Sequence, residues 1–166
     1  TKKLAKEGKG VIKYFMEKQK KTLRPTSSLV KQAVFNMLGD VEGLLFLDLF
    51  AGTGQMGIEA EMRGAKVIFV EKDPKLAREI KKKAKGKVVV SDVLIFLSSF
   101  EEKADLIFAD PPYAYQDYHK LIELSLKALK EGGVFILEHS KKVEFNSDRR
   151  KEYGDTALSI WRKSHD

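Results

Sequence analysis

LLFLDLFAGTGQMGIEA, residues 44–60, contains the strongest fold signal in this chain. Residues 44–50 are almost wholly apolar, which is typical of a short strand buried on both faces of a sheet. The glycines that follow predict a tight turn, and the residues after that turn predict a helix. A strand, a glycine turn and a helix in this order form the first unit of a doubly wound α/β sheet.

The same alternation continues toward the C-terminus. We expect strands at 66–72, 87–92, 104–110 and 133–139, with helices from Pro74 to about 85, at 93–99 and at about 117–130. Residues 149–153 and 157–163, joined by Gly154-Asp155, predict an antiparallel hairpin. Upstream, residues 27–38 have the apolar spacing of an amphipathic helix, with Gly39 at its end. The sequence therefore predicts a doubly wound α/β fold with a mostly parallel sheet.

Length and composition exclude several classes of protein. The 166 residues suit one domain, and no apolar run approaches the roughly 18 residues of a membrane span. The N-terminus lacks the apolar core of a signal peptide, so we expect a cytoplasmic location. The absence of cysteine excludes disulfides, iron–sulfur clusters and methylation through a cysteine adduct. The three histidines lack metal-ligand spacing, and we expect no metal.

The positive charge is concentrated near the N-terminus. The formal net charge is +7, and residues 1–38 contain ten Lys and Arg against two acidic residues. A basic arm on a nearly neutral domain indicates phosphate binding, although a solubilising lysine-rich helix would look the same. We expect a basic extension at 1–23 and the folded domain at 24–166.

Acidic residues accompany the glycine turn. Gly52-Thr53-Gly54-Gln55-Met56-Gly57 fits the pattern G-x-G-x-x-G, which alone does not separate a nicotinamide cofactor from S-adenosylmethionine. Asp48 lies beside the turn, Glu71 ends the second strand and Asp92 follows the third. A carboxylate in the position of Glu71 can accept both ribose hydroxyls, and Asp92 can accept from an adenine amino group.

These carboxylates favour S-adenosylmethionine over a dinucleotide. They attract a sulfonium and an ammonium cation, whereas they repel a pyrophosphate. The predicted cofactor pocket is lined by Asp48, Phe50, Ala51, Gly52, Gly54, Glu71, Lys72, Asp92 and Val93.

The tetrapeptide Asp110-Pro111-Pro112-Tyr113 follows the fourth predicted strand. Its prolines fix the backbone and lack N–H donors, which leaves nearby carbonyls as acceptors. Asp110 adds a carboxylate acceptor, and Tyr113 offers a face for stacking. Together they predict a catalytic site for a planar base that carries an amino group. The alternative is a proline-stiffened turn that binds no ligand. This alternative is the weaker one, because the tetrapeptide follows the fourth strand while the glycine turn follows the first.

At this point the chain resembles the RsmD-type small-subunit rRNA guanine-N2 methyltransferases. The resemblance lies in RPTSSLVKQAVFNML (24–38), LDLFAGTGQMGIEA (47–60), SDVLIFL (91–97), DPPY (110–113) and GGVFILEHS (132–140), with YGDTALSIW (153–161) closing. It implies a Rossmann-like class I methyltransferase with a seven-stranded sheet and S-adenosylmethionine as cofactor. It also implies ribosomal RNA as partner and methyl transfer to guanine N2, with Arg24 and Thr26 near the cofactor or the RNA. Residues 1–23 match the family's usual opening hairpin poorly.

Other functions remain as alternatives. Adenine-N6 methylation of DNA or RNA uses the same tetrapeptide, but 166 residues leave little room for a DNA-recognition region. Glutamine methyltransferases usually carry Asn where this chain has Asp110. A nicotinamide-dependent oxidoreductase would need a proton donor that the sequence does not offer, and a non-catalytic RNA-binding module would not need an intact Asp-Pro-Pro-Tyr.

Several other residues have two interpretations. Tyr115 and Tyr118 extend a base-stacking surface or pack a helix, and we assign Tyr115 to the RNA side. Trp161 is expected in the core, and Lys81-Lys82-Lys83 with Lys85 on a solvated helix face. A monomer is favoured.

Overall fold

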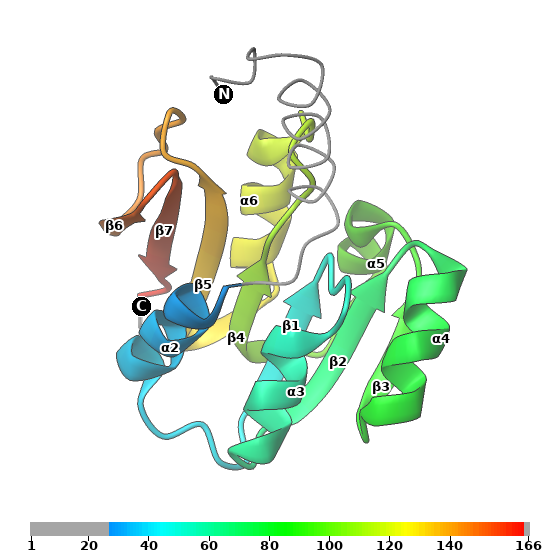
Figure 1. Cartoon of the computed structure of the whole chain (residues 1–166). Coiled ribbons are helices and arrows are strands. Elements are labelled where there is room, and N and C mark those ends of the chain that lie inside the picture. The colour runs from blue at the N-terminus through cyan, green and yellow to red at the C-terminus, as the bar shows by residue number, and fades with distance from the viewer. Residues whose placement is uncertain (1–26, 165–166) are drawn as a thin grey trace, which may run out of the picture.

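The structure is a computed structural model that describes residues 27–164. A seven-stranded sheet runs through the molecule, and helices cover both of its faces (Figure 1). Along the chain the elements are α2 (Ser28–Leu38), β1 (Leu45–Leu49), α3 (Gln55–Met62), β2 (Lys66–Glu71), α4 (Pro74–Lys83), β3 (Lys87–Val90), α5 (Val93–Ser99), β4 (Ala104–Ala109), α6 (Tyr118–Lys127), β5 (Leu129–Ser140), β6 (Arg149–Tyr153) and β7 (Thr156–Arg162).

The strand order is β3-β2-β1-β4-β5-β7-β6. The first five strands of the chain pair in parallel, and β7 pairs antiparallel with both β5 and β6. The chain reverses its direction of travel across the sheet between β1 and β4, which is where doubly wound sheets bind their ligands. The predicted mostly parallel sheet with a C-terminal antiparallel hairpin is thus confirmed.

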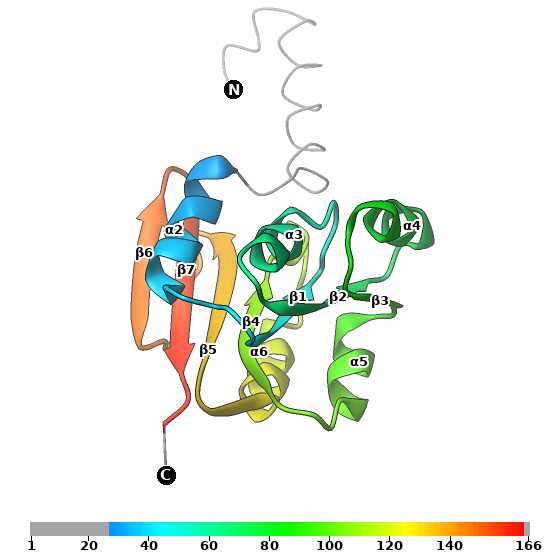
Figure 2. The ribbon, with the colours of Figure 1, turned by 90° about the horizontal axis from the view of Figure 1, so that it is seen from below.

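Two apolar layers bury the sheet from opposite sides. Buried residues of α2, α3 and α4 pack on one face, whereas those of α5 and α6 pack on the other (Figure 2). Phe46 and Phe108 point into the first layer, and their neighbours Leu47 and Ile107 into the second. The alternation explains why these central strands are almost wholly apolar in sequence.

Local signals set the helix ends where the sequence predicts them. The Ser27 hydroxyl accepts a 3.2 Å hydrogen bond from the Val30 amide at the start of α2. Asp73 accepts one from the Lys75 amide and precedes Pro74 in the first turn of α4. Each cap satisfies an amide that the helix leaves without an internal partner.

The predicted boundary between α6 and β5 is wrong by several residues. α6 ends at Lys127, and β5 begins at Leu129, four residues before the predicted start. Leu129 pairs with Ala104, and the register then shifts so that Leu106 pairs with Val134. The segment between these two pairs is hydrogen-bonded to the chain just after β7, where the Gly132 amide donates to the Lys163 carbonyl. Tertiary pairing therefore extends a strand through polar residues that carry no strand signal of their own.

Candidate active site

The turn between β1 and α3 is tightly wound. The Gly54 amide donates to the Ala51 carbonyl at 2.7 Å, and the Ala51 amide donates to the Val70 carbonyl at 3.0 Å. Gly54 has φ 79°, a left-handed conformation that glycine adopts without steric cost. The backbone of residues 51–54 is thereby fixed against the end of β2.

Asp48 anchors the start of α3 from beneath. Its Oδ2 accepts a 2.9 Å hydrogen bond from the Gly57 amide, and the side chain is buried. A Cβ at Gly57 would lie 2.9 Å from Cζ of Phe69 and 3.0 Å from Asp48 Oδ2, so only glycine fits here. The third glycine of the predicted G-x-G-x-x-G pattern therefore serves close packing of helix on sheet.

Glu71 joins the turns that follow β1 and β2. Its Oε1 accepts the Gly52 amide at 2.7 Å, and its Oε2 accepts the Asp73 amide at 2.9 Å. Each carboxylate oxygen has a second lone pair, so these bonds leave acceptor capacity for a ligand hydroxyl. The side chain is only 9% exposed, which fixes its orientation.

Asp48, Glu71 and Asp110 share one face of the sheet. Asp48 pairs with Phe69 on β2 and with Phe108 on β4, and Glu71 and Asp110 each lie two residues further along those strands. From strand spacing and rise, each flanking Cα is about 8 Å from that of Asp48. The three predicted carboxylates therefore meet at the carboxyl edge of the sheet.

The neighbouring carboxylates affect the ionisation of Asp48. Burial raises the pKa of Asp48 well above its usual value, and the Asp110 and Glu71 carboxylates raise it further against the lowering effect of the Gly57 amide. Neither Asp48 nor Glu71 forms an ion pair with any residue between 27 and 164. The site is thus suited to a cationic ligand group.

Asp92, Lys72 and Val93 lie at the ends of the neighbouring strands. Asp92 follows β3 and caps α5, where its Oδ2 accepts the Ile95 amide at 3.1 Å. Lys72 is exposed, whereas the Val93 side chain is 3% exposed and packs in the core. Of these three side chains only Asp92 is a carboxylate acceptor, and its bond to an adenine amino group stays a prediction.

The tetrapeptide after β4 presents its aromatic ring to solvent. Pro111 is buried, whereas Tyr113 is 57% exposed. The Pro112 carbonyl accepts the Tyr115 amide at 3.0 Å, which closes a turn just after the tetrapeptide. Stacking of the Tyr113 ring against a base stays a prediction.

A row of aromatic rings borders the same edge. The ring centroids of Phe50 and Tyr115 are 5.1 Å apart, those of Tyr115 and Tyr118 are 5.4 Å apart, and those of Tyr118 and Phe145 are 5.2 Å apart. Phe50 is the single non-glycine residue with a positive φ, 59°, among the described residues. Such strained backbone is often found at functional sites.

Tyr115 has a buried hydroxyl within this row. The oxygen finds no hydrogen-bond partner among residues 27–164. Burial raises the pKa of Tyr115 to about 12, with further contributions from Asp117 and Asp92. Tyr115 packs between Phe50 and Tyr118, so its ring is part of the aromatic row. Its contact with RNA stays a prediction.

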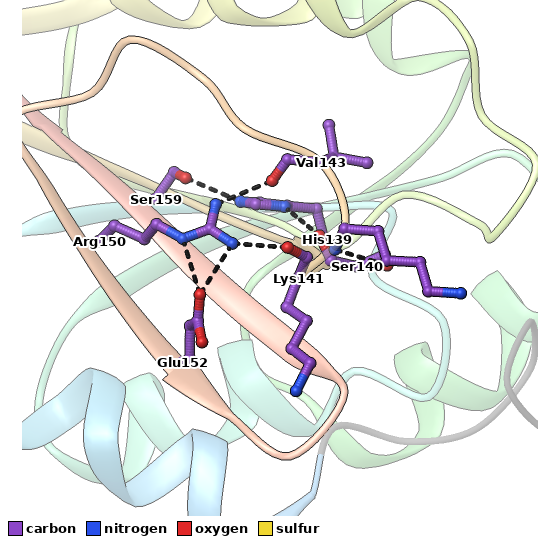
Figure 3. Close-up of polar contacts among 8 residues, drawn as sticks. His139, Ser140, Lys141, Val143, Arg150, Glu152 and Ser159 are labelled. Carbon is purple, nitrogen blue, oxygen red and sulfur yellow. Dashed lines mark hydrogen bonds and ion pairs between the residues drawn. The ribbon is translucent and has the colours of Figure 1, made fainter.

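A network beside the site was not predicted from the sequence. Arg150 donates from Nη1 to the Val143 carbonyl at 2.8 Å and from Nη2 to the Lys141 carbonyl at 2.7 Å, while Glu152 binds the same guanidinium (Figure 3). This holds the loop of residues 141–148, which carries Phe145 against the aromatic row. Only the paired strands bring Arg150 to that loop, so no local signal could have found it.

His139 lies in the same network. Its Nδ1 is 2.8 Å from the Ser140 carbonyl, which only accepts, so Nδ1 carries the proton and Nε2 accepts from the Ser159 hydroxyl at 2.7 Å (Figure 3). Burial lowers the pKa of His139, and Arg150 lowers it further against the bond to Ser140. His139 is therefore a neutral structural residue that joins β5 to β7.

Other predicted residues have simpler outcomes. Trp161 is in the core, as predicted, and its indole N–H donates to the Asn146 carbonyl. The lysines at 81–83 and 85 are exposed, also as predicted. Arg24, Thr26 and the segment 1–23 lie outside the described residues. Residues 27–164 hold no cluster of three potential metal ligands and no helix long and apolar enough to cross a membrane.

The strand order, the glycine turn after β1 and the acidic strand ends define a Rossmann-like methyltransferase fold of class I. The chain belongs to the family described as "Conserved hypothetical protein 95", which matches residues 8–162. This match reaches into the predicted extension at 1–23, so the boundary at residue 24 stays a prediction.

Named relatives and solved structures agree with this membership. YlbH of Bacillus subtilis is 33% identical over 84% of this chain and 88% of its own length. Ribosomal RNA small subunit methyltransferase D of Haemophilus influenzae is 34% identical over 72% of this chain and 69% of its own. A tRNA (guanine(10)-N2)-dimethyltransferase of Methanocaldococcus jannaschii is 30% identical over 70% of this chain and 38% of its own. The structure of hypothetical protein TTHA0928 of Thermus thermophilus superposes with a TM-score of 0.76 at 30% identity, covering 83% of this chain and 87% of its own.

Proposed function

We propose that this chain is an S-adenosylmethionine-dependent methyltransferase that acts on the exocyclic N2 of a guanine in small-subunit ribosomal RNA. The observation that carries the proposal is the common face shared by Asp48, Glu71 and Asp110, with Asp110-Pro111-Pro112-Tyr113 directly after β4. The names of its relatives in Haemophilus influenzae and Methanocaldococcus jannaschii support the RNA substrate and the guanine N2 position.

The residues around the glycine turn fit the cofactor. Glu71 keeps acceptor capacity for the ribose hydroxyls, and we assign the Asp92 carboxylate, at the start of α5, to the adenine amino group. The carboxylates around Asp48 attract the two cations of the methionine end, and Lys72 and the Val93 backbone adjoin the same strand ends. When bound, S-adenosylmethionine supplies a methyl group on a positively charged sulfur.

The residues after β4 hold the target base. The amino nitrogen of guanine is a poor nucleophile because its lone pair is delocalised into the ring. Asp110 and the Pro111 carbonyl accept its two N–H groups, which favours a more tetrahedral nitrogen with an available lone pair. Tyr113 stacks on the base and fixes its plane. Positioning and preorganised acceptors supply most of the acceleration.

The surroundings of the reaction follow from this assignment. A base in structured RNA must leave its stack to enter the pocket. Because the substrate is ribosomal RNA, the protein acts in the cytoplasm, and a monomer has every residue that the site uses. Residues 24–166 form the methyltransferase domain, and Arg24, Thr26 and Tyr115 act on the cofactor or RNA side.

The test is transfer of radiolabelled methyl from S-adenosylmethionine to unmodified small-subunit particles, bulk tRNA and duplex DNA. We expect N2-methylguanine in the ribosomal RNA and a loss of about 10²–10³ in rate for Asp110→Ala. Asp155→Ala, in the exposed turn before β7, is the matched control and should retain the rate. Label on adenine in DNA would replace the proposal with the adenine-N6 alternative.

A further inference from the structure

A groove separates α2 from β6, the strand at the edge of the sheet. It has a volume of about 550 Å³ and is lined by Gln32 and Asn36 on α2 and by Arg149, Lys151 and Tyr153 on β6. A second hollow of about 430 Å³ shares Met37 and Arg149 with it and continues along the sheet toward Arg162. The two hollows adjoin on the side of the molecule that α2 covers, and Asp148 lines the second one.

The groove opens on the same face of the sheet as Asp110. Lys151 pairs with Leu158, and Leu158 pairs with Glu138 on β5. Ala109 pairs with Leu137, so Asp110 lies beside Glu138 at the end of the same row. Directly paired residues point to the same face, and three strand spacings of about 4.8 Å separate Asp110 from Lys151 by about 14 Å.

The charge of the groove is opposite to that of the cofactor pocket. No Asp or Glu lines the hollow between α2 and β6. Arg149 and Lys151 form no ion pair with any residue that the structure describes, because Glu152 points to the other face and binds Arg150. The amides of Gln32 and Asn36 and the ring of Tyr153 add hydrogen-bonding and stacking groups.

We infer that this groove binds the RNA strand next to the target nucleotide, with backbone phosphates on Arg149 and Lys151. The inference rests on the proposed function and extends it to a docking surface. Two cations in a hollow that no carboxylate lines match a phosphate backbone, and the amides and ring beside them match exposed bases. The negative pocket thus receives the cationic cofactor, while the positive groove guides the polyanion to the pocket's rim.

The test combines Arg149→Gln with Lys151→Gln in the full chain. Binding of an unmodified small-subunit rRNA transcript is measured by fluorescence anisotropy over a series of salt concentrations. Loss of two single-strand phosphate contacts should lower the slope of log K against log salt by about 1.4. Lys81→Gln with Lys82→Gln, on the exposed side of α4 near the opposite edge of the sheet, removes the same charge and should leave the slope unchanged.

Two further readings separate this inference from the proposed function. S-adenosylhomocysteine affinity should match the unmodified protein, since neither residue adjoins the cofactor pocket. Equal salt slopes for the two double variants would overturn the groove, even if methyl transfer to RNA is observed. The Arg149→Gln, Lys151→Gln variant could also bind RNA normally yet fail to methylate assembled particles. That result would assign the groove to a ribosomal protein and also overturn the inference. Absence of methyl transfer by the unmodified protein would instead count against the proposed function.

Discussion

Glu71 at the end of β2 accepts the Gly52 amide at 2.7 Å and so ties itself to the glycine turn that follows β1. Its second oxygen accepts the Asp73 amide in the turn after β2. One carboxylate therefore fixes two of the loops that border the predicted cofactor pocket. The pocket is preorganised by the same side chain that is expected to bind the ribose.

Glu71→Gln should weaken binding of S-adenosylhomocysteine by about 10- to 100-fold. The amide has only one acceptor atom and no charge, so it cannot serve both backbone amides and a ligand hydroxyl. Charge-assisted hydrogen bonds contribute about 1.5–3 kcal/mol each. Isothermal titration calorimetry measures the change. Glu79→Gln, whose side chain is 61% exposed on α4, is the control, and equal affinities for both variants would contradict a ligand role for Glu71.

We expect the free energy of unfolding to depend on pH because of Asp48. Burial raises the pKa of Asp48 in the folded protein above the unfolded value of 3.8. The stability that comes from the protonated Asp48 is therefore fully present below about pH 4 and is lost as pH rises through the folded pKa. Asp48→Asn keeps an oxygen for the Gly57 amide but does not ionise. Its free energy of unfolding, relative to the unmodified protein, should therefore rise between about pH 4 and neutrality.

Urea denaturation of both proteins at several pH values within this window measures the difference. Comparing the two proteins cancels every other titrating group that they share. The difference in unfolding free energy between variant and unmodified protein could instead stay constant or fall as pH increases. That outcome would show that the surroundings of Asp48 do not disfavour its charged form.

The fold was largely predictable because its signals are local and periodic. The apolar run before Gly52 identifies β1, and Ser27 and Pro74 mark helix starts within one residue. The start of β5 at Leu129 was not predictable, because pairing with β4 and with the chain after β7 imposes strand geometry on polar residues. Long-range pairing leaves no trace in a local sequence window.

The residues of the site also divide into those that carry a local sequence signal and those that do not. Asp48, Glu71 and Asp110 were predicted because each is an acid near the carboxyl end of an apolar strand or directly after it. Glu138 follows that rule on β5 and lies beside Asp110, so the same signal could have found it. Arg150 could not be found, since its partners are loop carbonyls that tertiary structure alone brings within reach.

Gly57→Ala should destabilise the protein through a clash with Phe69. The new methyl would lie 2.9 Å from Cζ of that ring and 3.0 Å from Asp48 Oδ2. Overpacking costs about 1–3 kcal/mol, against a gain in helix propensity of about 1 kcal/mol. In a Phe69→Leu background the smaller side chain makes room, so the added cost of Gly57→Ala should shrink. A double-mutant cycle by urea denaturation tests this, and additive effects would show that Phe69 is not the obstacle.

Arg150→Lys should loosen the loop of residues 141–148 although the charge is kept. A lysine cannot present the planar fork that binds the carbonyls of Lys141 and Val143 at once, and losing such bonds costs about 1–3 kcal/mol. The loop carries Phe145 against Tyr118, so the end of the aromatic row would lose its support. Amide hydrogen exchange within 141–148 should quicken, and methyl transfer should slow more than cofactor binding weakens. Arg78→Lys, exposed on α4, is the control. If exchange in the loop is equally slow in both variants, the strands and Phe145 hold it without the guanidinium.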